Sequence, residues 1–296
     1  RLDLYADMGL NILRVWGGAI LEKETFYELC DERGLMVWQE FPLSSSGVEN
    51  LPPDDPTVLA ELGEIAASYL WRRGGHASLL VWSGGNELFE QDGGTPVDTR
   101  YPAIALMAGI VARLNPGARF VATSPSGPRF SYDPELSGQG LHHDVHGPWV
   151  MSGILGEWEA YWRGHDAMLV LEVGVPACAS MRILERYAGG LALWPPSIDN
   201  PLWRYRQPWW LQWDRLADAH GFERDRDEMA RFVARSQQEQ ADALACLVAS
   251  CKGRFPRCGG VMIWMGHDCF PCLSNTSIID FEGCPKPAVA AIKAVL

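Results

Sequence analysis

The chain has 296 residues, is 47% hydrophobic and carries a formal net charge of −12. This length fits one α/β barrel domain of about 250 residues. The acidic balance, without any cluster of Lys and Arg, argues against nucleic acid and against an anionic membrane surface as partners. No apolar run reaches the length of about 18 residues that a membrane-spanning helix needs, so we expect no membrane partner.

Strands and helices alternate along the chain. Residues 1–10 are typical of the end of a helix that stops at Gly9. Short apolar runs bounded by turn residues then predict buried strands. These predicted strands lie at residues 11–16, 35–41, 78–82, 119–123, 141–146, 168–173 and 260–264. Predicted helices lie at residues 22–33, 57–73, about 100–114, about 226–252 and from 287 onward.

This alternation predicts a parallel sheet with crossover helices, and the fold class that we expect is α/β, a (β/α)8 TIM barrel. Because seven strands are counted, the barrel lacks its first strand, which would have to precede Arg1. We interpret residues 1–296 as a single barrel domain and a fragment of a longer protein, with residues 181–258 inserted between the last two strands. No signal-peptide pattern opens the chain, and its compartment, cytoplasmic or exported, stays open.

The predicted strand at 78–82 leads into the most informative stretch of the sequence. Gly84 and Gly85 follow it, and Asn86 and Glu87 come next. Glycines at the end of a strand allow a ligand to approach the backbone closely. In α/β barrels the chemistry is carried by polar groups at the C-terminal ends of strands. Taken alone, Glu87 would be better explained as a loop residue that faces water.

A second carboxylate, Glu172, lies near the end of the strand at 168–173. Two carboxylates meeting at one edge of a barrel match the needs of glycoside cleavage, in which one is the acid and the other the nucleophile or base. The two roles require different pKa values, which the surroundings must set. Arg14, at the end of the first predicted strand, is placed to keep one carboxylate ionised, although a purely structural ion pair is the alternative.

Thirteen Trp residues also suit a cleft in which sugar rings stack on aromatic side chains, although most of them are expected to be core. The Trp-rich segment at 193–213 lies within the predicted insertion. Its group of Trp209, Trp210 and Trp213 is interpreted either as a lid over a pocket or as a hydrophobic anchor for the insertion.

The spacing of the cysteines and histidines gives little support to a metal site or to redox chemistry. Eight cysteines are present, and the CxxC pair Cys269 and Cys272 lacks the second CxxC or His pair of a zinc site. One or two disulfides near the C-terminus and reduced thiols are both compatible with the spacing. His142, His143, Asp144 and His146 crowd one predicted strand, but their spacing matches no standard zinc pattern. We therefore expect no metal and no cofactor.

The sequence resembles the family 2 glycoside hydrolases, especially β-mannosidases. Residues 11–41 (NILRVWGGAILEKETFYELCDERGLMVWQEF) are similar to the second and third barrel strands of that family, and residues 76–87 (HASLLVWSGGNE) to its acid/base strand. Three further stretches are similar to later barrel segments of the family: DVHGPW at 144–149, LEVGV at 171–175 and residues 264–286. In this clan the acid/base follows strand four and the nucleophile strand seven, which correspond to the third and sixth strands here if the first is missing. The resemblance also implies N-terminal β-sandwich domains that are missing from this chain.

Carried over by position, the resemblance implies Glu87 as acid/base and Glu172 as nucleophile. The implied substrate-binding residues are Arg14, Trp16, Asn86, His146 and Trp264. Asn86 would bond the 2-hydroxyl of the sugar, Arg14 would orient Glu172, and the other three would line the −1 subsite. A core role for the two Trp residues and a structural role for His146 are the alternatives, and Gln39 and Glu40 receive no assignment.

Two segments depart from the family pattern. Leu171-Glu172-Val173-Gly174 stands where the family has Ser-Glu-Phe-Gly, and residues 267–271 read HDCFP where it has NDCWP. The expected function is a retaining exo-β-glycosidase acting on terminal β-mannosides or a related glycoside, with an oligosaccharide or glycoside as its partner. The alternatives are a β-galactosidase, β-glucuronidase, exo-β-glucosaminidase or endo-glycanase of the same clan, and a non-catalytic carbohydrate-binding fragment.

Overall fold

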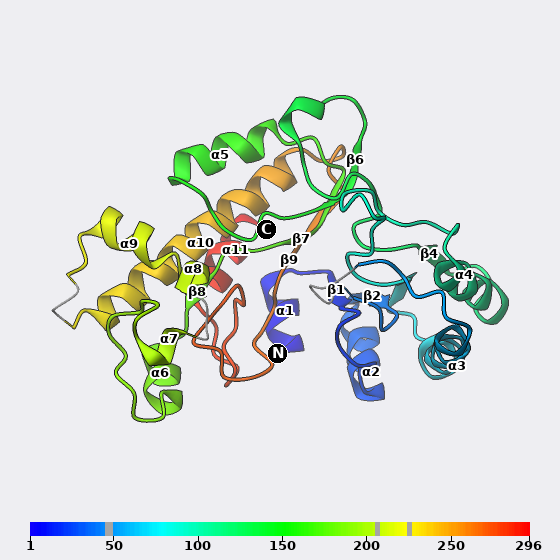
Figure 1. The fold of residues 1–296 in the computed structure, drawn as a ribbon, viewed down its shortest axis with the longest axis horizontal. Coiled ribbons are helices and arrows are strands. Elements are labelled where there is room, and N and C mark those ends of the chain that lie inside the picture. Colours follow the sequence, from blue (N-terminus) through cyan, green and yellow to red (C-terminus); the bar gives the residue numbers. More distant parts are fainter. Residues whose placement is uncertain (45–49, 205–207, 224–226) are drawn as a thin grey trace. The chain divides into compact units, whose positions relative to one another are not determined.

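The computed structural model describes residues 1–44, 50–204, 208–223 and 227–296 (Figure 1). Contacts within the chain divide it into two compact units. The first comprises Arg1–His146, His165–Glu172 and Pro256–Met262, and the second comprises Gly147–Gly164, Val173–Phe255 and Ile263–Leu296. Neither unit is continuous in sequence, because the chain passes between them several times.

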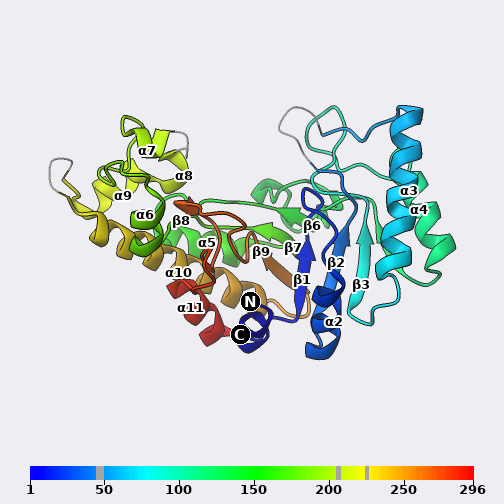
Figure 2. The ribbon, with the colours of Figure 1, turned by 90° about the horizontal axis from the view of Figure 1, so that it is seen from below.

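Two four-stranded sheets form the framework of the first unit. The first sheet runs in the order β1 (Ile12–Val15), β2 (Met36–Glu40), β3 (Leu79–Ser83) and β4 (Arg119–Val121), and all its neighbouring strands are parallel. Figure 2 shows β1, β2 and β3 side by side. The second sheet runs in the order β5 (Gly127–Pro128), β6 (His142–His146), β7 (Leu169–Val173) and β9 (Gly260–Ile263). Strands β6 and β7 are parallel, whereas the short β5 is antiparallel to β6.

The helices of the first unit begin and end where local chemistry dictates. They are α1 (Leu2–Met8), α2 (Glu24–Arg33), α3 (Pro56–Arg73), α4 (Pro102–Leu114) and the 3₁₀ helix Pro134–Leu136. Asp55 caps α3 by accepting hydrogen bonds from the backbone N–H groups of Thr57 and Val58, at 2.8 and 3.2 Å. Helix α2 ends at Gly34, whose φ of 65° lies in the left-handed region that glycine adopts without strain.

One apolar core lies between these helices and the first sheet. Its fully buried side chains include Tyr27 of α2, Trp82 of β3 and Met107 of α4. Phe41 stacks on Trp82 with ring centroids 5.2 Å apart. Burial of such large side chains stabilises the unit by roughly 1.5–3 kcal/mol each, and it fixes how the helices cover the strands.

A second apolar cluster joins the two sheets of the first unit. Trp38 and Val81 from the first sheet pack with Leu171 from the second, and partly buried side chains of both sheets complete the cluster. In α/β barrels the strands enclose layers of packed side chains in this way. All seven predicted strands are confirmed as β1, β2, β3, β4, β6, β7 and β9, and the described residues hold no strand before β1.

The second unit is mainly helical. Its elements are α5 (Leu155–Gly164), β8 (Ala177–Cys178), α6 (Met181–Tyr187), α7 (Pro201–Arg204), α8 (Pro208–Leu211), α9 (Trp213–His220), α10 (Met229–Gly253), β10 (Ser274–Asn275) and α11 (Pro287–Val295). Helix α10, which the sequence predicts at about 226–252, contacts both α5 and α11. Trp213 is buried against Phe222 and Phe232, so the anchor interpretation holds for this residue. The side chain of Trp209 lies outside the described residues.

The cysteines and the helices give two further findings. All eight cysteines are free thiols, and Cys269 is exposed while Cys272 is half-buried. Among the described residues, none of the helices has the length and hydropathy needed to cross a membrane. The division into one barrel domain with an insertion at 181–258 stays a proposal.

Candidate active site

The turn after β3 depends on its two glycines. A Cβ atom on Gly84 would lie 2.3 Å from the carbonyl oxygen of Ala122, and one on Gly85 would lie 2.6 Å from that of Leu43. No real Cβ approaches an oxygen so closely, so larger residues would push the neighbouring segments apart. The glycines therefore let the chain pass between these segments and deliver the next two residues to the end of the strand.

Glu87 is held in an unusual backbone conformation directly after this turn. Its φ of 52° lies in the left-handed region, which non-glycine residues rarely adopt. Its backbone N–H donates to the carbonyl of Ser124 at 2.6 Å, and its own carbonyl accepts from the side-chain amide of Asn50 at 2.7 Å. Contacts on both sides thus fix the direction in which the Glu87 side chain leaves the backbone.

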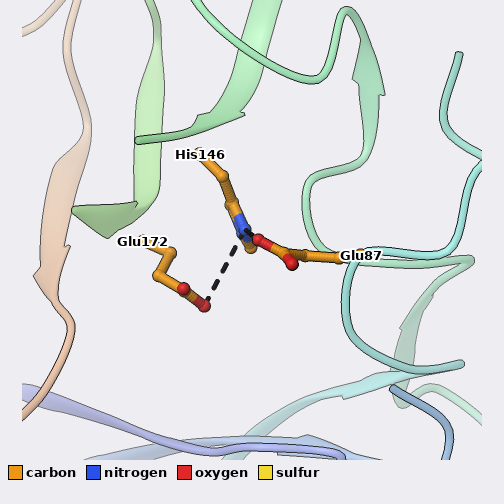
Figure 3. Close-up of side chains that lie close together, drawn as sticks. All are labelled: Glu87, His146 and Glu172. Carbon is orange, nitrogen blue, oxygen red and sulfur yellow. Dashed lines mark hydrogen bonds and ion pairs between the residues drawn. The ribbon is translucent and has the colours of Figure 1, made fainter. Parts of the chain in front are cut away.

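The neighbouring strands β6 and β7 bring a histidine and a second carboxylate to the same place. His146 is the last residue of β6 and pairs in register with Glu172 of β7. One oxygen of Glu87, one nitrogen of His146 and one oxygen of Glu172 all lie within 4.8 Å of one another. Figure 3 shows the three side chains pointing toward one another. All three belong to the first unit.

His146 sits between the two carboxylates. Its Nδ1 lies 3.1 Å from Oε1 of Glu87 and 3.8 Å from Oε2 of Glu172. Its Nε2 lies 2.8 Å from the hydroxyl of Ser124. Burial lowers the pKa of His146 to about 3, because desolvation of the ring outweighs the attraction of Glu172. The ring is therefore neutral at physiological pH.

Arg14, near the C-terminal end of β1, donates hydrogen bonds to three side chains at once. Its Nη1 donates to Oε2 of Glu172 at 2.6 Å, its Nε donates to Oε1 of Glu40 at 2.8 Å, and its Nη2 donates to Oδ1 of Asn86. Burial opposes the charge of Arg14, but the carboxylates of Glu40 and Glu172 outweigh that effect and raise its pKa. Arg14 is thus a permanent cation that fixes both Glu172 and the amide of Asn86.

Two acidic residues received no role from the sequence, and the first of them, Glu40, belongs to this network. Glu40 at the end of β2 bonds Arg14 through Oε1 and accepts from the backbone N–H of Gly17 through Oε2, at 2.7 Å. Asp144, two residues before His146, is buried, and burial raises its pKa to about 7 although Ser126 donates a hydrogen bond to it. Its Oδ1 has no hydrogen-bond partner among the described residues.

Three other residues singled out in the sequence are Trp16, Trp264 and His142. Trp16 is half-buried just after β1, with its ring against Gly18. Trp264 belongs to the second unit, so its place in the site stays a prediction. His142 pairs with Asp166 at 2.6 Å, which is a structural role for one member of the histidine group.

Glu87, His146 and Glu172 also satisfy the spacing of metal ligands, and no other group of three metal-binding side chains of that spacing occurs among the described residues. A metal would need the lone pair of His146 Nδ1 and an oxygen of Glu172 that Arg14 already bonds at 2.6 Å. The donor set is therefore better suited to proton transfer than to metal binding. The absence of a metal and of a cofactor stays a prediction.

An α/β barrel with two carboxylates at the ends of its strands is an arrangement that barrel glycoside hydrolases use. Residues 20–105 match the family model described as glycosyl hydrolases family 2, TIM barrel domain. A curated relative, β-mannosidase B of Thermothelomyces thermophilus, is 26% identical over 322 aligned positions that cover 98% of this chain and 36% of the relative. Over residues 20–105 the chain thus matches the barrel domain of glycoside hydrolase family 2, and almost its whole length is similar to β-mannosidases.

Solved structures agree on the fold. The β-D-mannosidase of Dictyoglomus thermophilum superimposes with a TM-score of 0.77 at 23% identity, over 99% of this chain and 35% of that one. The β-glucuronidase of Parabacteroides merdae superimposes with a TM-score of 0.56 at 15% identity, over 99% and 33%. The predicted TIM barrel is thereby confirmed. This chain spans about a third of the length of the relatives that it matches.

Proposed function

We propose that this chain is the catalytic barrel of a retaining exo-β-glycosidase that cleaves terminal β-mannosides. The observation that carries the proposal is the approach of Glu87 and Glu172, whose oxygens come within 4.8 Å across His146. Retaining enzymes hold their two carboxyl groups about 5–5.5 Å apart, whereas inverting enzymes need about 6.5–9.5 Å to admit a water molecule. The name of the curated relative supports mannose as the sugar.

The surroundings of the two carboxylates support different roles for them. Glu172 is almost fully buried and bonds the permanent cation Arg14, which favours the ionised form that a nucleophile needs. The Glu87 side chain is more exposed, at 17% against 7% for Glu172, and its Oε1 faces the neutral ring of His146. This position suits a group that must gain and lose a proton during each turnover.

The proposed reaction has two steps. Glu172 attacks the anomeric carbon while Glu87 protonates the leaving oxygen, which gives a covalent glycosyl ester on Glu172. Glu87, now a carboxylate, removes a proton from water as the water attacks the same carbon and frees Glu172. The configuration at the anomeric carbon is inverted twice and therefore retained.

Asn86 is proposed to bond the 2-hydroxyl of the sugar. Its Oδ1 accepts from Arg14, and one hydrogen of its Nδ2 points to the hydroxyl of Ser44 at 3.2 Å. The second hydrogen of Nδ2 is then the donor available to a substrate hydroxyl. Trp16, His146 and Trp264 are proposed to line the −1 subsite with it.

A mechanism-based label tests the proposal directly. A 2-deoxy-2-fluoro-β-mannosyl fluoride should react once per chain, and mass spectrometry of the digest should locate the sugar on Glu172. A label on another residue would refute the nucleophile assignment. Turnover of a panel of nitrophenyl β-glycosides would identify the sugar, with the mannoside expected to lead and the glucuronide as the principal rival. If the folded chain neither reacts nor turns over, while sugars still raise its melting temperature, it is a carbohydrate-binding fragment instead.

A further inference from the structure

Ser124, three residues after the end of β4, contacts both the proposed acid Glu87 and its neighbour His146. Its carbonyl accepts from the backbone N–H of Glu87 at 2.6 Å, and its hydroxyl lies 2.8 Å from Nε2 of His146. Both Ser124 and His146 are completely buried. The two contacts use different groups of Ser124, so the hydroxyl can be removed without disturbing the backbone bond to Glu87.

The hydroxyl of Ser124 determines which nitrogen of His146 carries the proton. Within the part of the chain that the structure describes, Nε2 of His146 is the partner recorded for this hydroxyl. A buried hydroxyl needs an acceptor for its own hydrogen, and an acceptor role would leave that hydrogen without one. Ser124 is therefore the donor and Nε2 the acceptor, and the neutral ring carries its single proton on Nδ1.

The other side of the ring leads to the same tautomer. Nδ1 faces Oε1 of Glu87 at 3.1 Å and Oε2 of Glu172 at 3.8 Å. A lone pair on Nδ1 would face Oε2 of Glu172, which belongs to the carboxylate held by Arg14, and the two would repel each other. A hydrogen on Nδ1 removes that repulsion and can be donated to Oε1 of Glu87.

We propose that Ser124 locks His146 in its Nδ1–H form, and that this N–H occupies Oε1 of Glu87 so that the acid carries its own proton on Oε2. When Oε1 is occupied by a donor, the proton of a neutral carboxyl group resides on the other oxygen. His146 then serves as a positioning residue, and Ser124 positions His146. The statement about Glu87 rests on the proposed glycosidase function, whereas the tautomer of His146 does not.

Loss of the hydroxyl should release the lock. In Ser124→Ala the ring can adopt the Nε2–H form, and its Nδ1 lone pair then accepts the acidic proton of Glu87. The proton is turned away from the leaving group, so acid assistance falls. Because general acid catalysis contributes about 10²–10⁴-fold, we expect kcat/KM for poor leaving groups such as phenol to fall about ten- to a hundredfold. Dinitrophenyl glycosides need no protonation, and their glycosylation rate should change less than about threefold.

The tautomer can be read without any catalysis. In chains labelled with ¹⁵N-histidine, the Nδ1 and Nε2 shifts of His146, assigned by their loss in His146→Gln, should show the proton on Nδ1. Ser124→Ala should move these signals toward the other tautomer. The matched control is Ser83→Ala, which removes a completely buried hydroxyl that donates to the carbonyl of Gly85 at 3.1 Å and should leave the His146 signals in place.

The outcomes separate this proposal from the proposed function. A proton on Nε2 in the unmutated chain, or signals unchanged by Ser124→Ala, would overturn the lock whatever the activity. A loss of kcat/KM that is equal for all leaving groups would overturn the placement of the acidic proton. If the unmutated chain turns over no glycoside, the proposed function fails, and the histidine spectra alone decide the lock.

Discussion

Arg14 and Glu172 form an ion pair at 2.6 Å although the side chains of both residues are more than nine-tenths buried. The same guanidinium also bonds Glu40 and Asn86, so one planar group sets the positions of three side chains from three other strand ends. A fork of five donors is what allows this, and the ammonium group of lysine offers no such geometry. The buried guanidinium of Arg14 therefore both attracts Glu172 and fixes the orientation of the three side chains that it bonds.

Replacing Arg14 with Lys should separate these two contributions. Lys keeps the positive charge but cannot reach Glu172, Glu40 and Asn86 together. We expect the chain to stay folded while kcat/KM falls about a hundredfold, which corresponds to about 2.7 kcal/mol of transition-state stabilisation. Arg33→Lys is the matched control, because Arg33 pairs with the exposed Asp3 and should change neither activity nor stability measurably. Full activity of Arg14→Lys would show that charge alone suffices.

Gly84 gives a second prediction, about the turn that carries Glu87. A Cβ on Gly84 would lie 2.3 Å from the Ala122 carbonyl, so Gly84→Ala must displace the backbone of the neighbouring strand end. We expect a loss of about 1–3 kcal/mol in the free energy of unfolding, as for other overpacked sites, together with reduced turnover. Gly75→Ala, with nothing within 4 Å of the new methyl group, should stay within about 0.5 kcal/mol of the parent chain in urea unfolding.

The strands and the two principal carboxylates were predictable from the sequence for a clear reason. Strands buried in a barrel read as short apolar runs, and the residues after them must lie at one edge of the sheet. The order of the strands is therefore enough to predict that Glu87, Glu172 and Arg14 lie near one another. His146, at the end of the weak strand β6, was named only through the family resemblance and without its partners.

Other members of the site were not predictable because they depend on register and loop geometry. Glu40 ends an apolar strand, and only the pairing of β1 with β2 shows that it meets Arg14. Ser124 is one serine in a loop rich in Ser, Pro and Gly, and nothing in its spacing points to His146. Helix α5 was missed as well, since its apolar side is formed by Trp158 and Trp162 within a short polar segment.

Asp144 should make the free energy of unfolding fall as the pH rises from about 4 to about 7. Its pKa is raised to about 7 by burial, above the value of about 3.9 expected in the unfolded chain. The folded state therefore keeps a proton that the unfolded state loses, and this contribution to stability is present below about pH 4 and is lost as pH rises toward about 7. Asp144→Asn, which cannot ionise, should remove that loss.

The measurement is urea unfolding of the parent chain and of Asp144→Asn between pH 4 and 8. The variant should gain stability relative to the parent chain as pH rises, by up to about 4 kcal/mol over the whole range. An equal difference between the two chains at every pH would show that Asp144 does not change its ionisation between the folded and unfolded states. Asp7→Asn serves as the control, because Asp7 is an exposed carboxylate on helix α1.

The stereochemistry of azide rescue can assign the two carboxylates independently of any rate ratio. In Glu87→Ala the covalent ester on Glu172 still forms from a dinitrophenyl β-glycoside, but no base remains to activate water. Azide needs no base and enters through the space that Glu87 vacated, so kcat should rise and the product should be the β-glycosyl azide. In Glu172→Ala the azide enters from the opposite face of the sugar and displaces the leaving group once, which gives the α-glycosyl azide. Because the two side chains lie on either side of His146, NMR of the two products should show opposite anomers, and the same anomer from both variants would contradict the proposed roles.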